Sequence, residues 1–125
     1  MAFNSGFQEG LIKSEIKFWL KINDIKMEIR EFQNLIREIY FEKDCVNGSR
    51  ERIFLWLIEE VGELAEEMRK SDKKTDSMEK EFADVLAWLS SLANFYDIDL
   101  EECVKKKYPG KCPGCLKKPC ECRDS

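Results

Sequence analysis

Apolar residues recur every three to four positions along most of this chain, which is the period of an amphipathic α-helix. The pattern therefore predicts an all-α fold with a bundle of four to five helices. The expected helices cover residues 11–25, 27–41, 50–70 and 76–96, followed by a short helix that begins near Asp99 and ends at Tyr108.

The two longest predicted helices carry the clearest apolar stripes. On the helix over 50–70 we take as the core face the series Phe54, Leu57, Ile58, Val61, Leu64, Ala65 and Met68. The helix over 76–96 has a stripe of large apolar residues, namely Met78, Phe82, Val85, Leu86, Leu89, Leu92, Ala93 and Tyr96. It also has a second face of small residues, namely Ala83, Ala87, Ser90, Ser91 and Asn94. Two packable faces on one helix of so small a protein predict a homo-oligomer.

Polar segments connect the helices. Residues 42–49 break the pattern and predict a loop, with Ser49 as the N-cap of the next helix. Asp76, followed three residues later by a glutamate, predicts a capping arrangement at the start of the helix over 76–96. Lys43 and Arg50 are either solvated charges or contacts to phosphate.

The first 26 residues form an extension. Residues 1–6 show no periodicity, whereas residues 11–25 predict an extra amphipathic helix with the apolar residues Ile12, Ile16, Trp19, Leu20 and Ile22 among lysines. Packing against the core or a partner is the favoured interpretation, and a position on a membrane surface is the alternative. No apolar run is long enough for a membrane span or a signal-peptide core, so we expect a cytoplasmic protein without a membrane partner.

Composition narrows the class of partner. Charged residues make up 37% of the chain and the formal net charge is −4, which suits amphipathic helices and argues against a broad basic surface for nucleic acid. Small ligands or proteins are the expected partners.

Carboxylates are the first chemical feature of the sequence. Glu60 and Glu63 are one turn apart on one predicted helix, and Glu81 and Asp84 are one turn apart on the next. Two antiparallel helices could bring the four together, where their repulsion requires a divalent cation, and oxygen ligands suit Mg²⁺ or Mn²⁺. A solvated acidic face is the alternative, and it is our interpretation of Glu66 and its neighbour Glu67.

Two other positions lie beside these carboxylates. Gly62 stands in a helix interior, where glycine costs about 1 kcal/mol relative to alanine, which suggests close approach of a ligand or another helix. Trp88 is one turn beyond Asp84, and two interpretations stay open: a core or interface position, and stacking on a nucleobase.

Cysteines are the second chemical feature. Cys112, Cys115, Cys120 and Cys122 lie within eleven residues, among lysines that would offset the charge of thiolates. This density predicts a tetrahedral Zn²⁺ site in a tail over residues 110–125. Disulfides, an iron-sulfur cluster and a site shared between subunits are the alternatives. The two remaining cysteines, Cys45 and Cys103, are expected to be buried thiols.

The chain has no histidine, which removes Ser-His and Cys-His nucleophile systems and histidine-ligated zinc hydrolases. Glycine-rich phosphate loops are absent too. Clustered carboxylates that hold hard metal ions remain, and these suit attack of water on a phosphoanhydride.

These segments resemble a known family. Residues 59–65 read Glu-Glu-Val-Gly-Glu-Leu-Ala, residues 81–86 read Glu-Phe-Ala-Asp-Val-Leu, and residues 97–101 and 107–109 read Asp-Ile-Asp-Leu-Glu and Lys-Tyr-Pro. Together they are similar to the MazG-like nucleotide pyrophosphohydrolases, over roughly residues 29–109. That family has an all-α oligomeric fold, binds Mg²⁺ through an E-E-x-x-E segment and a later E-x-x-D segment, and splits nucleoside triphosphates into monophosphate and pyrophosphate.

The resemblance assigns roles to residues of this chain. The Mg²⁺ ligands would be Glu60, Glu63, Glu81 and Asp84. Glu59 would orient water as a base or add a ligand, and Lys107 and Tyr108 would lie near the substrate phosphates.

We therefore expect an extension over residues 1–26, a pyrophosphohydrolase domain over 27–109 and a zinc-binding tail over 110–125, assembled as a homodimer or homotetramer. A different class of function is a non-catalytic helical adaptor whose cysteine tail recruits a protein.

Overall fold

The computed structural model describes residues 9–123, and this part of the chain is helical without strands. Its helices are α1 (Glu9–Asn23), α2 (Ile29–Asn47), α3 (Arg50–Lys70), α4 (Asp76–Phe95) and α5 (Leu100–Lys107). The all-α fold and the order of the helices are therefore as the sequence predicts. The first six residues and the side chains of Ile12 and Trp19 lie outside the described part.

Side-chain caps explain where three of the helices begin. The Ser49 hydroxyl accepts a hydrogen bond from the Arg52 backbone N–H at 3.2 Å, which confirms the predicted cap. The Asp99 carboxylate accepts one from the Glu102 backbone N–H at 3.1 Å, at the predicted start of the last helix. The prediction that Asp76 caps α4 is wrong. Thr75 is the cap and accepts from the Met78 N–H at 3.1 Å, because the hydroxyl one residue earlier meets the free N–H groups of the first turn.

The loop predicted over residues 42–49 is mostly helix. Helix α2 continues to Asn47 and ends where the Gly48 backbone N–H donates to the Asp44 carbonyl at 2.8 Å. The polar residues of this stretch misled the prediction, since their side chains lie on a helix surface rather than in a loop. The extension of α2 matters because it carries Asp44 into the interior, where only 5% of its surface is exposed.

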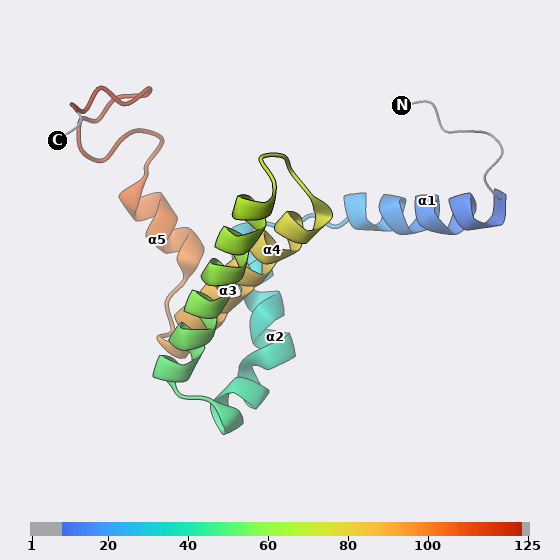
Figure 1. Ribbon diagram of the computed structural model, residues 1–125. Helices are drawn as coiled ribbons and strands as arrows, with labels where there is room; N and C mark the ends of the chain where they lie inside the picture. Colours follow the sequence, from blue (N-terminus) through green and yellow to red (C-terminus); the bar gives the residue numbers. More distant parts are fainter. Residues whose placement is uncertain (1–8, 124–125) are drawn as a thin grey trace.

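Helices α2, α3 and α4 form the bundle. A short connection makes α3 and α4 antiparallel neighbours, and α2 packs against α4 (Figure 1). The buried residues of this bundle are few, and polar ones are as prominent as apolar ones: Gln33, Ile36, Asp44, Ile53, Leu57, Ser90, Ser91, Ala93 and Asn94.

The buried face of α3 differs from the prediction, and the two predicted faces of α4 differ from each other in burial. Ile53 and Leu57 of α3 are buried, whereas Phe54, Ile58 and Val61 of the predicted core face are 49%, 50% and 43% exposed. On α4 the small residues Ser90, Ser91 and Asn94 are buried, whereas Ala87 is half-buried and Ala83 is exposed. Large residues of the apolar stripe face solvent. Small residues let the helices approach closely, so they fill the narrow space between them.

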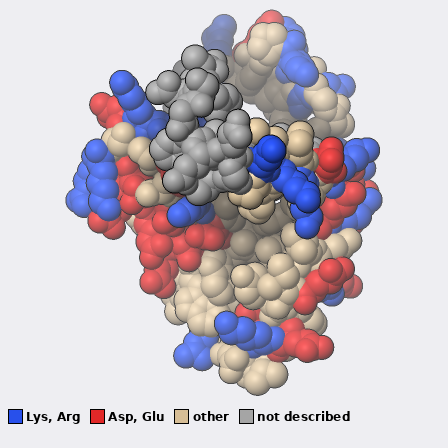
Figure 2. All heavy atoms as spheres, turned by 90° about the vertical axis from the view of Figure 1, so that its right-hand side faces the viewer, with Lys and Arg blue, Asp and Glu red and all other residues tan. Residues whose placement is uncertain are grey.

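Besides the buried core, α3 and α4 therefore carry an apolar surface that a single chain leaves exposed to solvent. Its exposed members on α3 and α4 are Phe54, Leu55, Ile58, Val61, Met68, Phe82, Leu86 and Leu89, and Tyr96 at the C-cap of α4 is exposed too. Figure 2 shows one face of the molecule, where acidic side chains gather beside a broad area with neither acidic nor basic residues. Exposed apolar surface of this extent is characteristic of interaction sites.

Helix α1 extends away from the bundle (Figure 1). Its apolar residues Ile16, Phe18 and Leu20 are 46%, 63% and 59% exposed, so they do not pack in the core of this chain. Within residues 9–123 every helix lacks either the length or the apolar character that crossing a membrane requires.

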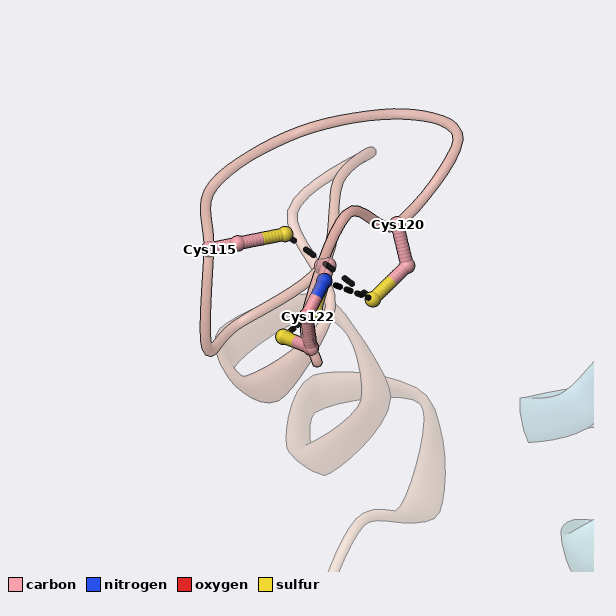
Figure 3. Close-up of side chains that lie close together, drawn as sticks. Cys115, Cys120 and Cys122 are labelled. Atoms are coloured by element: carbon pink, nitrogen blue, oxygen red, sulfur yellow. Dashed lines mark hydrogen bonds between the residues drawn. The ribbon is translucent and has the colours of Figure 1, made fainter. Parts of the chain in front are cut away.

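Residues 108–123 follow α5 without regular secondary structure. The chain turns back on itself there, and the sulfur atoms of Cys115, Cys120 and Cys122 point toward one another (Figure 3). The other two thiols of the chain, on Cys45 and Cys103, are exposed, which corrects the prediction that they are buried.

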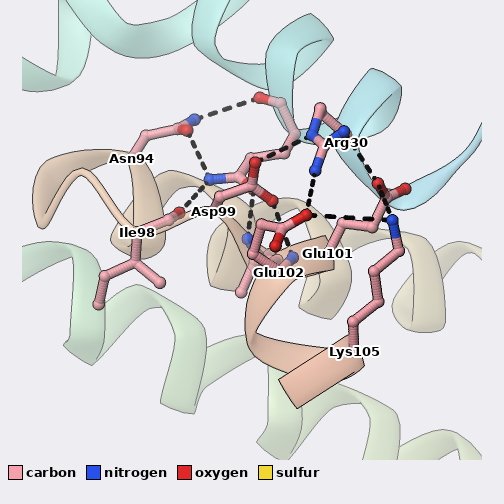
Figure 4. A network of polar contacts seen from close by, with 9 residues as sticks. Arg30, Asn94, Ile98, Asp99, Glu101, Glu102 and Lys105 are labelled. Carbon is pink, nitrogen blue, oxygen red and sulfur yellow. Dashed lines mark hydrogen bonds and ion pairs between the residues drawn. The ribbon is translucent and has the colours of Figure 1, made fainter. Parts of the chain in front are cut away.

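Polar contacts attach α5 to α2. The Gln33 side chain donates to the Asn94 side chain at 3.0 Å and to the Ile98 carbonyl at 2.6 Å, and it accepts from the Leu100 N–H at 2.9 Å. Arg30 forms ion pairs with Asp99, Glu101 and Glu102 at the first turn of α5, at 2.9, 3.1 and 2.9 Å (Figure 4). These contacts fix where α5 begins.

Candidate active site

Three of the four predicted carboxylate ligands converge between α3 and α4. Each of Glu60, Glu63 and Glu81 offers one oxygen, and these oxygens lie within 4.8 Å of one another. The antiparallel packing of α3 and α4 produces this cluster, because residues one turn apart on α3 face one turn of α4.

The cluster is partly removed from water. One oxygen of Glu60 and one of Glu81, both Oε2, are buried and have no hydrogen-bond partner among the described residues. The pKa of Glu60 is raised by burial and by the charge of Glu63. The pKa of Glu81 is raised by burial, then by the charges of Glu63 and Asp84. Both shifts express the cost of holding like charges together away from solvent.

Asp84 lies beside the cluster rather than within it. Its charge contributes to the raised pKa values of Glu60 and Glu81, although no oxygen of Asp84 belongs to the group of three. Asp84 lines a cavity together with Glu59 and Glu60. A ligand in this cavity would therefore meet carboxylates from both α3 and α4.

The cavity has a volume of about 380 Å³ and is bounded by α2, α3 and α4. Its lining residues are Tyr40, Lys43, Asp44, Asn47, Trp56, Glu59, Glu60, Asp84, Ala87, Trp88 and Ser91. Carboxylates form one part of the wall and aromatic rings another, so the cavity offers both a charged and an apolar surface to a ligand.

Trp88 connects the two parts of this wall. Its indole N–H donates to Glu60 Oε1 at 3.3 Å, and its ring lies 4.8 Å from that of Trp56, measured between centroids, with an angle of 52° between the planes. The hydrogen bond orients the Glu60 side chain and leaves its other oxygen free. Trp88 is therefore a residue of the cavity wall.

Sequence reasoning missed Asp44 and Trp56. Burial raises the pKa of the Asp44 carboxyl, and a hydrogen bond with the Ser91 side chain acts in the opposite direction. Helical spacing could have found both residues: Asp44 follows Tyr40 by one turn on α2, and Trp56 precedes Glu60 by one turn on α3. The incorrect loop over residues 42–49 concealed Asp44.

The basic residues that the sequence suggested as phosphate contacts differ in their distance from the cavity. Lys43 lines the cavity, whereas Arg50 lies over the Tyr96 ring, 5.3 Å from its centroid. Lys107 and Tyr108 stand at the end of α5 and do not line the cavity of their own chain. Glu66 and Glu67 both pair with Lys70, at 3.5 and 3.2 Å. The Glu66 side chain is 53% exposed, in agreement with the predicted solvated face, whereas that of Glu67 is only 21% exposed.

Gly62 stands between the ligand carboxylates but has no close neighbour. A Cβ placed there would meet no described atom within 4 Å, so the packing of a single chain does not require glycine.

The cysteine cluster is a second, separate group of possible metal ligands. The sulfur atoms of Cys112, Cys115, Cys120 and Cys122 lie within 4.8 Å of one another. Backbone N–H groups lower the pKa of Cys112 to about 6, whereas the neighbouring cysteine side chains raise that of Cys122 to about 12. In the described part of the chain, the oxygen donors therefore lie in the bundle and the sulfur donors in the tail.

Comparison with known proteins decides the family. A family model described as "MazG nucleotide pyrophosphohydrolase domain" matches residues 48–116, which is more than half of the chain. The chain belongs to the MazG nucleotide pyrophosphohydrolase family. The match spans α3, α4 and α5, and it therefore contains every carboxylate of the cluster. It begins after α2, whose residues complete the cavity.

A relative from Bacillus subtilis (strain 168), "Uncharacterized protein YpjD", is 36% identical over 89 residues. The aligned region covers 65% of this chain and 74% of that protein. Membership of the MazG family favours a pyrophosphohydrolase over the adaptor that was the alternative from sequence. Members of the family are typically metal-dependent, and the carboxylate cluster offers the oxygen donors that a hard metal ion requires.

Proposed function

We propose that this MazG chain hydrolyses nucleoside triphosphates to a nucleoside monophosphate and pyrophosphate, with Mg²⁺ held by Glu60, Glu63, Glu81 and Asp84. The buried Oε2 atoms of Glu60 and Glu81, which lack a hydrogen-bond partner in the described part, give the strongest support. An ionised carboxylate oxygen can only accept, and the two residues that carry these atoms are clustered with a third carboxylate, Glu63. A hard cation satisfies both oxygens and cancels the repulsion. Mn²⁺ shares this preference for oxygen.

Residues of the chain would divide the chemistry among them. The bound metal supplies Lewis-acid stabilisation of the charge on the phosphate groups. Glu59 is exposed at the wall of the cavity, next to the cluster, and we assign it the base that takes a proton from the attacking water. Lys43 lines the same cavity and would contribute positive charge toward the triphosphate.

The aromatic wall would bind the nucleobase. Trp56 and Trp88 offer flat apolar surface, and every base has a flat π-face that stacks on such rings. Because Trp88 also donates to Glu60, one side chain would couple the position of the base to that of a metal ligand. A Trp88→Phe variant keeps an aromatic ring but removes the donor. We expect it to lower kcat through Glu60, whereas Trp88→Ala should also raise KM.

A homo-oligomer, dimer or tetramer, would complete the enzyme. Phe54, Ile58 and Val61 of α3 are exposed, as are Phe82 and Leu86 of α4, the helix packed against it, and a second copy of the chain would cover this apolar surface. Lys107 and Tyr108, which lie away from their own cavity, could then contact the phosphates bound by a neighbour.

Mixing two inactive variants tests this arrangement. If Lys107 acts in a neighbouring chain, Lys107→Ala mixed with Glu60→Gln regains activity, because some sites in the mixed oligomer contain both intact residues. Lack of recovery in mixed oligomers, or a monomer in light scattering at working concentration, would contradict it.

Release of pyrophosphate tests the function itself. A panel of nucleoside triphosphates is assayed with and without Mg²⁺, for the wild type, for Glu60→Gln, Glu63→Gln, Glu81→Gln and Asp84→Asn, and for the control Glu66→Gln. Loss of a group that only supports a metal ligand already costs about 10–100-fold, so each ligand variant should lose at least that much. Glu66 is exposed and pairs with Lys70, so its variant should keep its activity. Equal, modest losses in all five variants would refute the assignment, and absence of pyrophosphate from every nucleotide would favour the adaptor.

A further inference from the structure

The four cysteines of the tail form a compact group. The Sγ atoms of Cys112 and Cys122 are 3.7 Å apart, those of Cys115 and Cys120 are 3.8 Å apart, and all four lie within 4.8 Å. Two loops bring them together, one over residues 112–115 and one over 120–122, and the sulfur atoms of Cys115, Cys120 and Cys122 point toward one another (Figure 3).

These separations match the edges of a metal-centred tetrahedron. Four sulfurs at about 2.3 Å from a central Zn²⁺ are separated from one another by about 3.8 Å. A disulfide would instead hold two sulfurs about 2.05 Å apart, and all four thiols are free. The spacing therefore fits ligation of one ion and not two disulfide bonds.

The backbone around the sulfurs is arranged to support negative charge. The Glu121 N–H donates to Cys115 Sγ, and the Cys122 N–H to Cys120 Sγ, both at 3.3 Å. Gly114 lies where a Cβ would come within 3.1 Å of Cys122 Sγ, so glycine leaves room for the sulfur atoms to approach. Hydrogen bonds from the backbone to sulfur stabilise thiolates, which are the form that binds metal.

The basic residues in and before the tail also favour a metal site with four thiolates. Seven basic residues and one acidic residue lie between Lys105 and Arg123. Four thiolates around a divalent ion leave a net charge of −2, which the nearby Lys111, Lys117 and Lys118 would offset.

Local contacts also hold the tail, namely backbone hydrogen bonds such as that from the Cys112 N–H to the Lys117 carbonyl at 3.0 Å and an ion pair between Lys117 and Glu121, but the tail has no apolar core. Residues 108–123 include no helix, strand or buried side chain, and Leu116 is 62% exposed. A segment of this size without a core needs a cross-link to overcome its conformational entropy.

We propose that Cys112, Cys115, Cys120 and Cys122 bind one Zn²⁺ in a closed tetrahedral site that stabilises the tail and is independent of the carboxylate cluster. Four protein ligands leave no open position, so the site is structural rather than catalytic. The two sites prefer different metals because their donor atoms differ. Thiolate sulfur favours zinc, whereas the carboxylate oxygens of Glu60, Glu63 and Glu81 favour Mg²⁺ or Mn²⁺.

The test measures zinc in the purified full-length chain by elemental analysis after dialysis against a buffer that contains Mg²⁺. We expect about one zinc per chain in the wild type and in Glu60→Gln. A Cys112→Ser/Cys115→Ser double variant should lose the zinc, and the matched control Cys45→Ser/Cys103→Ser, which changes the two exposed cysteines outside the cluster, should keep it. Iron in place of zinc, disulfides in mass spectrometry, or equal zinc in both double variants would overturn the proposal.

Two further measurements keep the proposal testable if the Cys112→Ser/Cys115→Ser variant folds poorly. Cobalt substituted into the wild-type chain should give the visible spectrum of tetrahedral thiolate coordination, and a spectrum of octahedral oxygen coordination alone would refute the site. Removal of zinc by a chelator should make residues 108–123 sensitive to protease while the helical circular dichroism of the bundle stays unchanged. A tail that stays resistant after zinc removal would contradict a stabilising role.

Discussion

Replacing Glu60 by glutamine should leave the stability of the metal-free protein intact while it reduces the additional stability gained when Mg²⁺ binds. Glutamine nearly preserves the volume of the side chain, and its carbonyl oxygen can still accept the hydrogen bond from Trp88. The change removes one of three clustered charges, so the metal-free protein should be as stable as the wild type or more stable, because repulsion with Glu63 is lost.

The magnitude follows from mass action. At a Mg²⁺ concentration about 100 times the wild-type Kd, binding stabilises the folded state by about 2.7 kcal/mol. A variant with about 100-fold weaker affinity keeps about 0.4 kcal/mol under the same conditions. For a chain of this size 1 kcal/mol corresponds to about 4 °C in Tm, so the Mg²⁺-induced shift should fall from about 10 °C to about 2 °C.

Differential scanning fluorimetry across a Mg²⁺ titration measures both effects, and Glu66→Gln is the matched control. Glu66 lies on the same helix, one turn beyond Glu63, and pairs with Lys70 at 3.5 Å. Its variant should keep the wild-type shift. The reasoning would be refuted if Glu60→Gln and Glu66→Gln showed the same Mg²⁺-induced shift, or if Glu60→Gln destabilised the metal-free protein.

Three other predictions concern stability. Since the pKa values of Glu60 and Glu81 are raised, the folded protein without metal binds protons more strongly than the unfolded chain. Its free energy of unfolding, measured by urea titration, should therefore fall as pH rises from 4.5 through the raised pKa values. The fall should be weaker in Glu60→Gln, which lacks one of the two carboxyls. Gln33→Leu should cost about 2–4 kcal/mol, because it leaves the partners of several hydrogen bonds unpaired, and a loss below about 1 kcal/mol in urea titration would contradict that network. Gly62→Ala should stabilise metal-free α3 by about 0.5–1 kcal/mol in thermal unfolding, and loss of activity in the same variant would indicate that a ligand or second chain approaches there.

Helix positions could be predicted from the sequence because they depend on local signals. The apolar period, the Ser49 and Asp99 caps and the lysines that end α5 act within a few residues of where they stand. The spacing of Glu60 and Glu63, one turn apart on one helix, is likewise determined by the local sequence. The convergence of Glu60, Glu63 and Glu81 was predictable once two antiparallel helices were assumed.

Which face of a helix is buried depends on its neighbours, and the prediction for α3 failed for this reason. Alternation of large and small residues on α4 is compatible with either face inward, and only close packing selects Ser90 and Ser91 for the interior. The stripe that contains Phe54 and Ile58 satisfies the helical period whether its partner is in the same chain or in another. Asp44 was missed because a charged residue in a polar stretch suggests a loop, unless the cavity that it lines is known.

The central claim is that the carboxylate cluster supports Mg²⁺-dependent release of pyrophosphate. Phosphorus-31 NMR of a wild-type reaction with one nucleoside triphosphate distinguishes the possible products directly. We predict nucleoside monophosphate and pyrophosphate in equal amounts when Mg²⁺ is present, and unchanged triphosphate when Mg²⁺ is absent. Nucleoside diphosphate with inorganic phosphate, or hydrolysis that proceeds without a divalent ion, would contradict the account.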